Sequence, residues 1–295
     1  MNDQNQSVSH FFRISCQSRL FVIAAVTLIA ACAEVRGPAE QDDAAKARSE
    51  IRGGYLSKDV YPDSLALVPP PPAEGSAALA LDQAVNAQML QLRGTPRWSL
   101  AVEDAVMNFP RLAQTFSCAL DLPITAQDTP ELYTLLRRTL SDGGLPVYAA
   151  KERYERPRPF VVNNKPTCTP KGERFMRKDG SYPSGHTAFG WAWALILTEI
   201  APERTDAILA RGRAFGESRM VCNVHWYSDV VAGRMVGAAA VARLHADPEF
   251  RAAVETARGE VVAARAQGLE PTRDCAAEAA ALNTAILGQD LPASY

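Results

Sequence analysis

The stretch that decides the fold is Tyr182-Pro183-Ser184-Gly185-His186-Thr187, which stands directly before an apolar run from Ala188 to Ile200. The run predicts a buried helix, so the stretch lies at a helix N-terminus, where backbone N–H groups lack partners and the dipole favours an anion. Gly185 lets a ligand approach the backbone, and Ser184 either caps the helix or donates its hydroxyl. His186 adds a proton donor. The stretch therefore predicts either an anion site or a capped helix with an incidental histidine.

The rest of the chain is dominated by alanine-rich segments with helical periodicity. Of its 295 residues 47% are hydrophobic, and the formal net charge is −2, which argues against nucleic acid as the main partner. Strand patterns are scarce, so we predict an all-α fold. The predicted helices cover residues 76–93, 98–107, 129–140, 145–154, 188–200, 203–219, 229–245, 247–266 and 271–287. A long irregular segment, 160–180, is of the kind that often carries function.

Residues 1–33 have the pattern of an export signal. Arginines precede an apolar run from Leu20 to Ala31, which is short for a membrane span. Ala31-Cys32-Ala33 suits an ordinary signal peptidase, whereas Ile29-Ala30-Ala31-Cys32 resembles a bacterial lipoprotein box in which Cys32 is lipidated. We expect a periplasmic protein by either route, with a lipid anchor at Cys32 in the second.

The remainder of the chain divides by composition. We expect a flexible linker at 34–60, a catalytic domain at 61–265 and a C-terminal helical extension at 266–295. Outside the export signal there are four cysteines: Cys118, Cys168, Cys222 and Cys275. An even number in an oxidising compartment predicts two disulfides, and spacing does not choose among the three pairings. Four buried thiols are the alternative.

Three clusters of polar residues lie in one continuous region. The first is Lys151 followed after six residues by Arg158-Pro159, and the second is Pro183-Ser184-Gly185-His186. The third is Ser218-Arg219, five residues, His225, three residues and Asp229. Taken singly, each also fits a solvated basic face, a helix cap or a structural histidine.

Taken together, the clusters supply what phosphoryl transfer needs. Lys151, Arg158 and Arg219 can neutralise phosphate oxygens, while Ser184 and the Gly185 N–H add fixed donors. A second group of residues can do the chemistry. Asp229 can hold one ring nitrogen of His225 and leave the other free to attack, and His186 can protonate the leaving oxygen. With only 4 histidines in the chain, a histidine-rich metal centre is poorly supported.

In order and spacing, the clusters resemble the signature of the type 2 phosphatidic-acid-phosphatase and haloperoxidase superfamily, and within it the exported class A non-specific acid phosphatases. The similarity also takes in residues 69–78, 178–187 and 236–248, and covers roughly 60–260. Glu217 and Tyr227 depart from the pattern we associate with this class, without removing a signature residue.

The resemblance implies a compact helical domain with its active site at helix ends, and a metal-independent reaction without cofactor through a phosphohistidine. In that mechanism His225 is the nucleophile, Asp229 fixes its tautomer and His186 is the acid. The phosphoryl oxygens are held by Lys151, Arg158, Arg219, Ser184 and Gly185. The implied substrates are small phosphomonoesters, at an acid pH optimum, and we expect a homodimer.

Three alternatives stay open. A lipid phosphatase of the superfamily should be polytopic, but the longest apolar run after the export signal, Thr187 to Ile200, contains Glu199. A vanadate-dependent haloperoxidase would use the same pocket, although such enzymes are generally larger. A non-catalytic phosphate-binding protein would not require two histidines and an aspartate.

Overall fold

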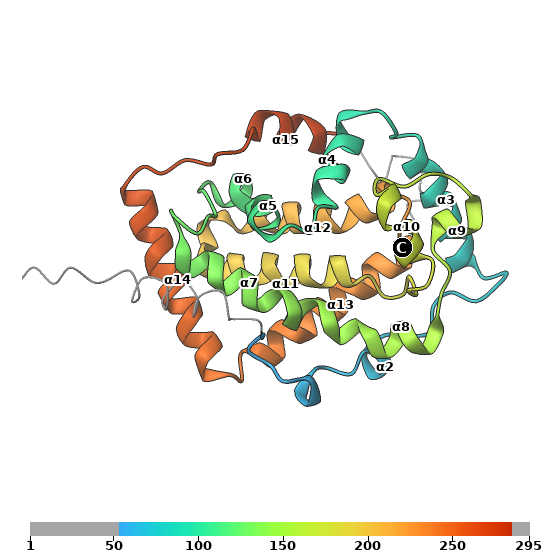
Figure 1. Ribbon diagram of the computed structural model, residues 1–295, viewed down its shortest axis with the longest axis horizontal. Helices are drawn as coiled ribbons and strands as arrows, with labels where there is room; N and C mark the ends of the chain where they lie inside the picture. The colour runs from blue at the N-terminus through green and yellow to red at the C-terminus, as the bar shows by residue number, and fades with distance from the viewer. Residues whose placement is uncertain (1–52, 285–295) are drawn as a thin grey trace, which may run out of the picture. The chain divides into compact units, whose positions relative to one another are not determined.

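The computed structural model describes residues 53–284, which lie within the second of two units of the chain, Ile51–Tyr295. Every regular element in this range is an α-helix or a short 3-10 helix (η), so the all-α prediction is confirmed (Figure 1). The export signal, Cys32 and most of the linker lie outside the described residues. The elements are η1 (Lys58–Val60), α2 (Ser64–Leu67), α3 (Ala77–Leu90), α4 (Pro96–Asp104), α5 (Phe109–Ala113), η2 (Gln114–Phe116), α6 (Ser117–Leu120), α7 (Pro130–Gly144), η3 (Leu145–Val147), α8 (Tyr148–Tyr154), α9 (Pro159–Asn163), η4 (Pro170–Gly172), α10 (Glu173–Met176), α11 (Gly185–Ile200), η5 (Pro202–Arg204), α12 (Thr205–Val221), α13 (Tyr227–Leu244), α14 (Pro248–Ala266) and α15 (Cys275–Leu282).

Helix α11 is the central element, and it packs against α7, α12 and α13 (Figure 1). It is apolar nearly all round, as expected for a helix surrounded by others, and Trp193 is fully buried. Helix α13 can approach α11 closely at Gly237 because glycine has no Cβ. A Cβ at this position would overlap the carbonyl oxygen of Ala188. Helix α14 covers α7, while α15 packs on α4. At the N-terminal end of α11, the Ser184 N–H donates to the carbonyl oxygen of Asp229 at 3.0 Å, which joins this end to the start of α13.

The segment 160–180 is less irregular than its prolines and glycines predict. It contains most of α9, all of η4 and all of α10, each too short to show a helical period in the sequence.

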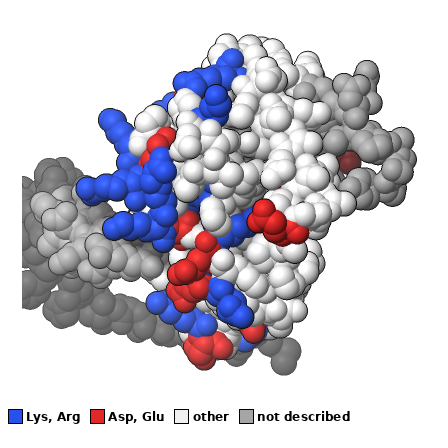
Figure 2. Space-filling model, turned by 90° about the vertical axis from the view of Figure 1, so that its right-hand side faces the viewer, with Lys and Arg blue, Asp and Glu red and all other residues white. Residues whose placement is uncertain are grey.

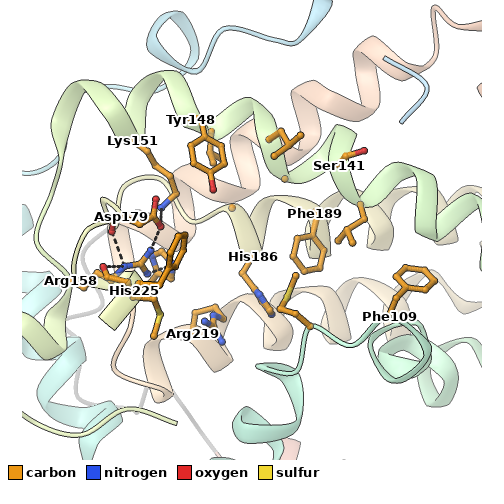
Figure 3. Close-up of a pocket in the computed structure, with 18 of the residues that line it drawn as sticks. Phe109, Ser141, Tyr148, Lys151, Arg158, Asp179, His186, Phe189, Arg219 and His225 are labelled. Carbon is orange, nitrogen blue, oxygen red and sulfur yellow. Dashed lines mark hydrogen bonds and ion pairs between the residues drawn. The ribbon is translucent and has the colours of Figure 1, made fainter. Parts of the chain in front are cut away.

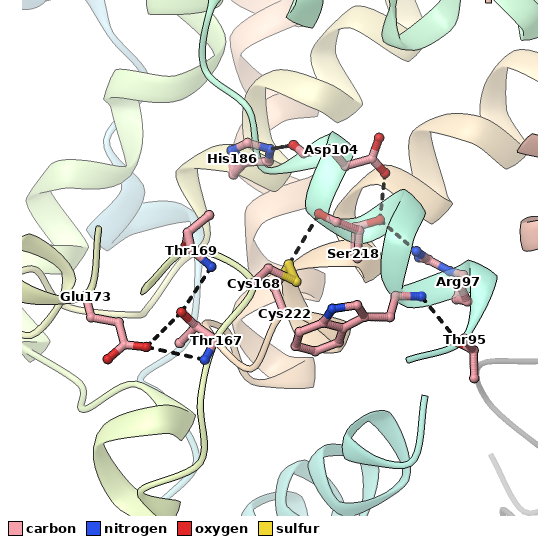
Figure 4. The surroundings of a disulfide bond; sticks show 12 residues. Thr95, Arg97, Asp104, Thr167, Cys168, Thr169, Glu173, His186, Ser218 and Cys222 are labelled. Carbon is pink, nitrogen blue, oxygen red and sulfur yellow. Dashed lines mark hydrogen bonds between the residues drawn. A yellow bond between two sulfur atoms is a disulfide. The ribbon is translucent and has the colours of Figure 1, made fainter. Parts of the chain in front are cut away.

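The prediction of two disulfides is confirmed, with the pairs Cys118–Cys275 and Cys168–Cys222. The second bond ties the segment to the end of α12, close to the third cluster (Figure 4). Within residues 53–284, no helix has the length and apolar character needed to cross a bilayer.

Candidate active site

A cavity of about 750 Å³ opens at the N-terminal end of α11 (Figure 3). Six of the eight predicted site residues line it: Lys151, Arg158, Gly185, His186, Arg219 and His225. They come from α8, the turn before α9, α11, α12 and the turn before α13. The two histidines, 39 positions apart in the sequence, therefore face one space.

His225 is held by Asp229 from behind. Its Nδ1 lies 3.3 Å from Oδ2 of Asp229, and the same oxygen accepts the Trp226 N–H at 2.8 Å. Its Nε2 lies 3.0 Å from Nη1 of Arg158. A carboxylate only accepts and a guanidinium only donates, so Nδ1 carries the hydrogen and Nε2 the lone pair. This is the tautomer that a nucleophilic imidazole facing the cavity requires.

Asp229 is itself anchored by a buried network. Its Oδ1 accepts from Arg156 Nη1 at 2.7 Å, and Arg156 Nη2 donates to Asp82 at 2.7 Å. Asp82 Oδ2 also accepts from the hydroxyl of Ser228 at 2.6 Å. Burial raises the pKa of Asp229, and the ion pair with Arg156 opposes that shift. The network fixes the carboxylate that orients the nucleophile.

Two of the predicted phosphate-binding cations share a carboxylate. Oδ2 of Asp179 accepts from Arg158 Nη2 at 2.6 Å and lies 3.3 Å from Lys151 Nζ. Lys151 Nζ also donates to the Gly180 carbonyl. Burial, with the charge of Arg158, lowers the pKa of Lys151 to about 8. Asp179 is thus the counter-ion of this cation pair.

Arg219 differs from these two cations. Within the described part of the chain, its buried Nε and Nη1 have no hydrogen-bond partner. Burial, reinforced by Arg158, lowers its pKa to about 9. A buried guanidinium with unpaired donors on a cavity is costly unless an anion completes it.

The second imidazole is oriented by a backbone carbonyl. His186 Nε2 lies 2.7 Å from the carbonyl oxygen of Asp104, so Nε2 is the donor and Nδ1 is the nitrogen left for the cavity. The ring stacks on Phe215 with centroids 4.6 Å apart and planes at 20°. Burial and the charge of Arg219 lower its pKa well below the usual 6.5.

Ser218 acts behind the cavity. Its hydroxyl donates to Asp104 Oδ2 at 2.6 Å and accepts from Arg97 Nη1 at 3.0 Å (Figure 4). Arg211 also binds the Asp104 carboxylate. The third cluster thus fixes the residue whose carbonyl holds His186.

Ser184 and Asp229 are the two predicted site residues that do not line the cavity. Ser184 Oγ caps α11, accepting from the N–H of Thr187 at 3.2 Å and from its hydroxyl at 3.0 Å. Its role as a phosphate ligand stays a prediction, as do the other assigned roles. Glu217 and Tyr227 also lie outside the cavity lining.

Sequence reasoning missed four residues: Asp82, Asp104, Arg156 and Asp179. Arg156 and Asp179 stand in or beside the quoted clusters, so a search for counter-ions could have found them. Asp82 and Asp104 lie far upstream and carry no local signal.

Basic side chains gather on one part of the surface near α9 and α10. The face at the α9 and α10 end carries a concentration of lysine and arginine (Figure 2). The exposed lysines and arginines of the segment 160–180 are Lys165, Lys171, Arg174, Arg177 and Lys178. Such a field attracts anions toward the opening. Within residues 53–284, no three histidine, cysteine, aspartate or glutamate side chains gather into a metal-binding group.

Comparison with known proteins agrees with the geometry. The family model described as "PAP2 superfamily" matches residues 133–252, which contain all three clusters. A non-specific acid phosphatase of Providencia stuartii is 46% identical over 207 residues, which are 70% of this chain and 84% of the relative. One from Salmonella typhimurium is 43% identical over 208 residues, 70% of this chain and 83% of the relative. An acid phosphatase of Zymomonas mobilis is 39% identical over 211 residues, 72% and 80% of the two chains.

Proposed function

Because the chain belongs to the PAP2 superfamily and to its bacterial acid phosphatases, we propose that it hydrolyses phosphomonoesters through a phosphohistidine, without a metal ion. One observation carries the proposal: two imidazoles, His186 and His225, face a single cavity lined by Lys151, Arg158 and Arg219. Binding alone would need the cations but not two differently oriented histidines.

In the first step Nε2 of His225 attacks phosphorus. A P–N bond forms as the P–O bond to the alcohol breaks, and Nδ1 of protonated His186 gives its proton to the departing oxygen. Asp229 stabilises the positive charge that develops on the His225 ring. The cations and the Gly185 N–H hold the three non-bridging oxygens as charge develops.

In the second step neutral His186 accepts a proton from water. The resulting hydroxide attacks phosphorus on the side opposite His225, the P–N bond breaks, and its electron pair returns to Nε2. Inorganic phosphate leaves, and His186 is again protonated. The cycle consumes water and ester and needs no co-reactant.

Substrate binding requires one local exchange. In this structure Arg158 donates to His225 Nε2 and to Asp179 Oδ2. A phosphoryl oxygen between Lys151 and Arg158 would replace Asp179 as acceptor and would draw Arg158 off the nucleophile's lone pair. The two unpaired donors of Arg219 supply further contacts without breaking an existing bond.

The test is turnover of a simple aryl phosphate by the purified protein. We expect full activity in a chelator, inhibition by vanadate, and loss of turnover in His225→Ala together with loss of acid-labile phosphoprotein after rapid quenching. Undiminished turnover by His225→Ala, or complete loss of activity in a chelator, would refute the mechanism. Halide oxidation in the presence of vanadate would instead indicate a haloperoxidase.

We also propose that the protein is exported to the periplasm and acts there as a dimer with an acid optimum. Mass spectrometry of the mature N-terminus distinguishes cleavage after Ala33 from a lipidated Cys32. Sedimentation velocity tests the dimer. Recovery of the uncleaved chain from the cytoplasm alone would contradict export.

A further inference from the structure

The active-site cavity extends well beyond the phosphate-binding cations. Along α7, η3 and α8 it is lined by a single stripe of residues: Arg137, Leu140, Ser141, Gly144, Leu145, Tyr148 and Lys151. These positions recur at three- and four-residue intervals, so they share one helical face. Phe109 and Ser141 lie at the opposite end of the cavity from Lys151 and Arg158, with His186 and Phe189 between them (Figure 3). The cavity is therefore a groove whose phosphate-binding end is Lys151.

Part of the groove lining is apolar and exposed. Ten large hydrophobic side chains are exposed in the described residues, and four of them line this groove: Met107, Leu145, Tyr148 and Phe175. Apolar side chains concentrated in this way mark a surface that a ligand covers. In Figure 3 His186 and Phe189 lie between Lys151 and the end formed by Phe109 and Ser141, so the alcohol portion of a bound monoester points along the groove toward Phe109.

The far end of the groove carries one cation. Arg137 is exposed, lines the cavity, and lies with its Cζ 5.7 Å from the centroid of the Phe109 ring. Within residues 53–284 no acidic side chain pairs with it, whereas its neighbour Arg138 binds Glu249. Lys151 lies 14 positions after Arg137. At a rise of 1.5 Å per residue, their Cα atoms are on the order of 20 Å apart along a straight axis, and bound anions would lie somewhat closer.

We propose that this groove is a subsite for phosphomonoesters whose alcohol is an elongated apolar body with a second anionic group at its far end, bound by Arg137. The proposal rests on the phosphatase activity proposed above. Phosphate and the second anion are held by cations at the two ends, and the exposed apolar side chains cover the body between them. A short monoester cannot reach Arg137 and gains nothing from it.

The experiment compares substrates that differ only in their ends. Kcat/KM is measured for alkyl phosphates of about ten carbons that end in a carboxylate or in a hydroxyl, below micelle-forming concentrations, and for the same pair with about four carbons. For the long pair we expect the wild type to prefer the carboxylate about three- to fivefold, the upper part of the range for an exposed ion pair. For the short pair we expect no preference. Arg137→Gln should abolish the long-chain preference, and Arg137→Lys should keep part of it.

Arg93→Gln is the matched control. Arg93 is also exposed and stands over an aromatic ring, with its Cζ 5.6 Å from the Trp98 centroid, but it does not line the groove. The Arg93→Gln variant should prefer the long carboxylate substrate over the long hydroxyl substrate to the same extent as the wild type. Equal kcat/KM for the two long substrates in the wild type would overturn the subsite, and so would a preference that survives Arg137→Gln. In both cases the phosphatase itself would stand, whereas failure to turn over any of the four substrates would overturn the proposed function as well.

Discussion

Replacing Asp229 by asparagine separates the catalytic role that we propose for it from its structural role. Both carboxylate oxygens face obligate donors, Arg156 at Oδ1 and the Trp226 N–H at Oδ2. Asparagine has one acceptor and one NH₂ group, so one of these donors must face an NH₂. If the NH₂ faces His225, it donates to Nδ1, moves the ring hydrogen to Nε2 and removes the attacking lone pair. If it faces Arg156, a buried ion pair is lost.

The expected size of both effects follows from these contacts. A wrong imidazole tautomer lowers kcat about 10³- to 10⁴-fold, equivalent to about 4 to 5 kcal/mol in the barrier. Breaking a buried ion pair costs about 3 to 5 kcal/mol. We expect the free energy of unfolding of Asp229→Asn to fall by about 3 kcal/mol, the lower end of this range. The loss is limited because Arg156 keeps its 2.7 Å contact with Asp82. Steady-state kinetics on an aryl phosphate and urea denaturation measure the two quantities.

Asp82→Asn is the control for stability. Asp82 accepts from the same Arg156 and from Ser228, but it does not touch His225. It should lose comparable stability while kcat stays within about tenfold of the wild type. If Asp229→Asn also keeps kcat within tenfold, or if both variants lose activity only in proportion to stability, the tautomer argument is wrong.

Three further outcomes follow from buried charge and from the disulfides. Since the pKa of Lys151 is lowered to about 8, competitive inhibition by inorganic phosphate should weaken above that pH, and Lys151→Arg should move the weakening to higher pH. Burial lowers the pKa of His186 and His225 well below 6.5 in the folded state, so the unfolded chain binds more protons as pH falls below 6.5. Stability should then fall by up to about 1.4 kcal/mol per pH unit for each ring, and calorimetry between pH 7 and 5 should find a shallower loss in His225→Gln. Replacing Cys118 and Cys275 by alanine removes a disulfide that links positions 157 residues apart, and the free energy of unfolding should fall by about 5 kcal/mol in urea denaturation. An unchanged midpoint would show that the bond hardly constrains the unfolded chain.

The fold was predictable where local chemistry decides it. Asp247-Pro248 predicts a capped helix start, and Asp247 indeed accepts from the Phe250 N–H at 2.8 Å as α14 begins. The run from Ala188 to Ile200 predicts the central helix for the same kind of reason. Disulfide pairing was not predictable, because it depends on which helix ends meet in space.

The site was predictable only to the extent that its residues lie in short spacings. His225 and Asp229 are four apart at a helix start, so their contact follows from the chain itself. Asp82 meets Ser228 from 146 positions away because α3 packs beside α13. Asp104 reaches His186 through the packing of α4 on α12. Supporting residues of this kind are set by tertiary packing, which leaves no period or spacing in the sequence.

The charges of the cavity imply that substrate binding raises the pKa of His186, the residue that we propose as the general acid. Burial and the charge of Arg219 lower the pKa of His186 well below 6.5, although the proposed mechanism needs this ring protonated. A bound phosphoryl group brings negative charge against these cations, so the pKa of His186 must rise in the complex. The alkaline limb of kcat, which reports the complex, should therefore lie at higher pH than that of kcat/KM, which reports the free enzyme. Coincident limbs would mean that the cations do not control His186, and the proton would then have to arrive with the substrate.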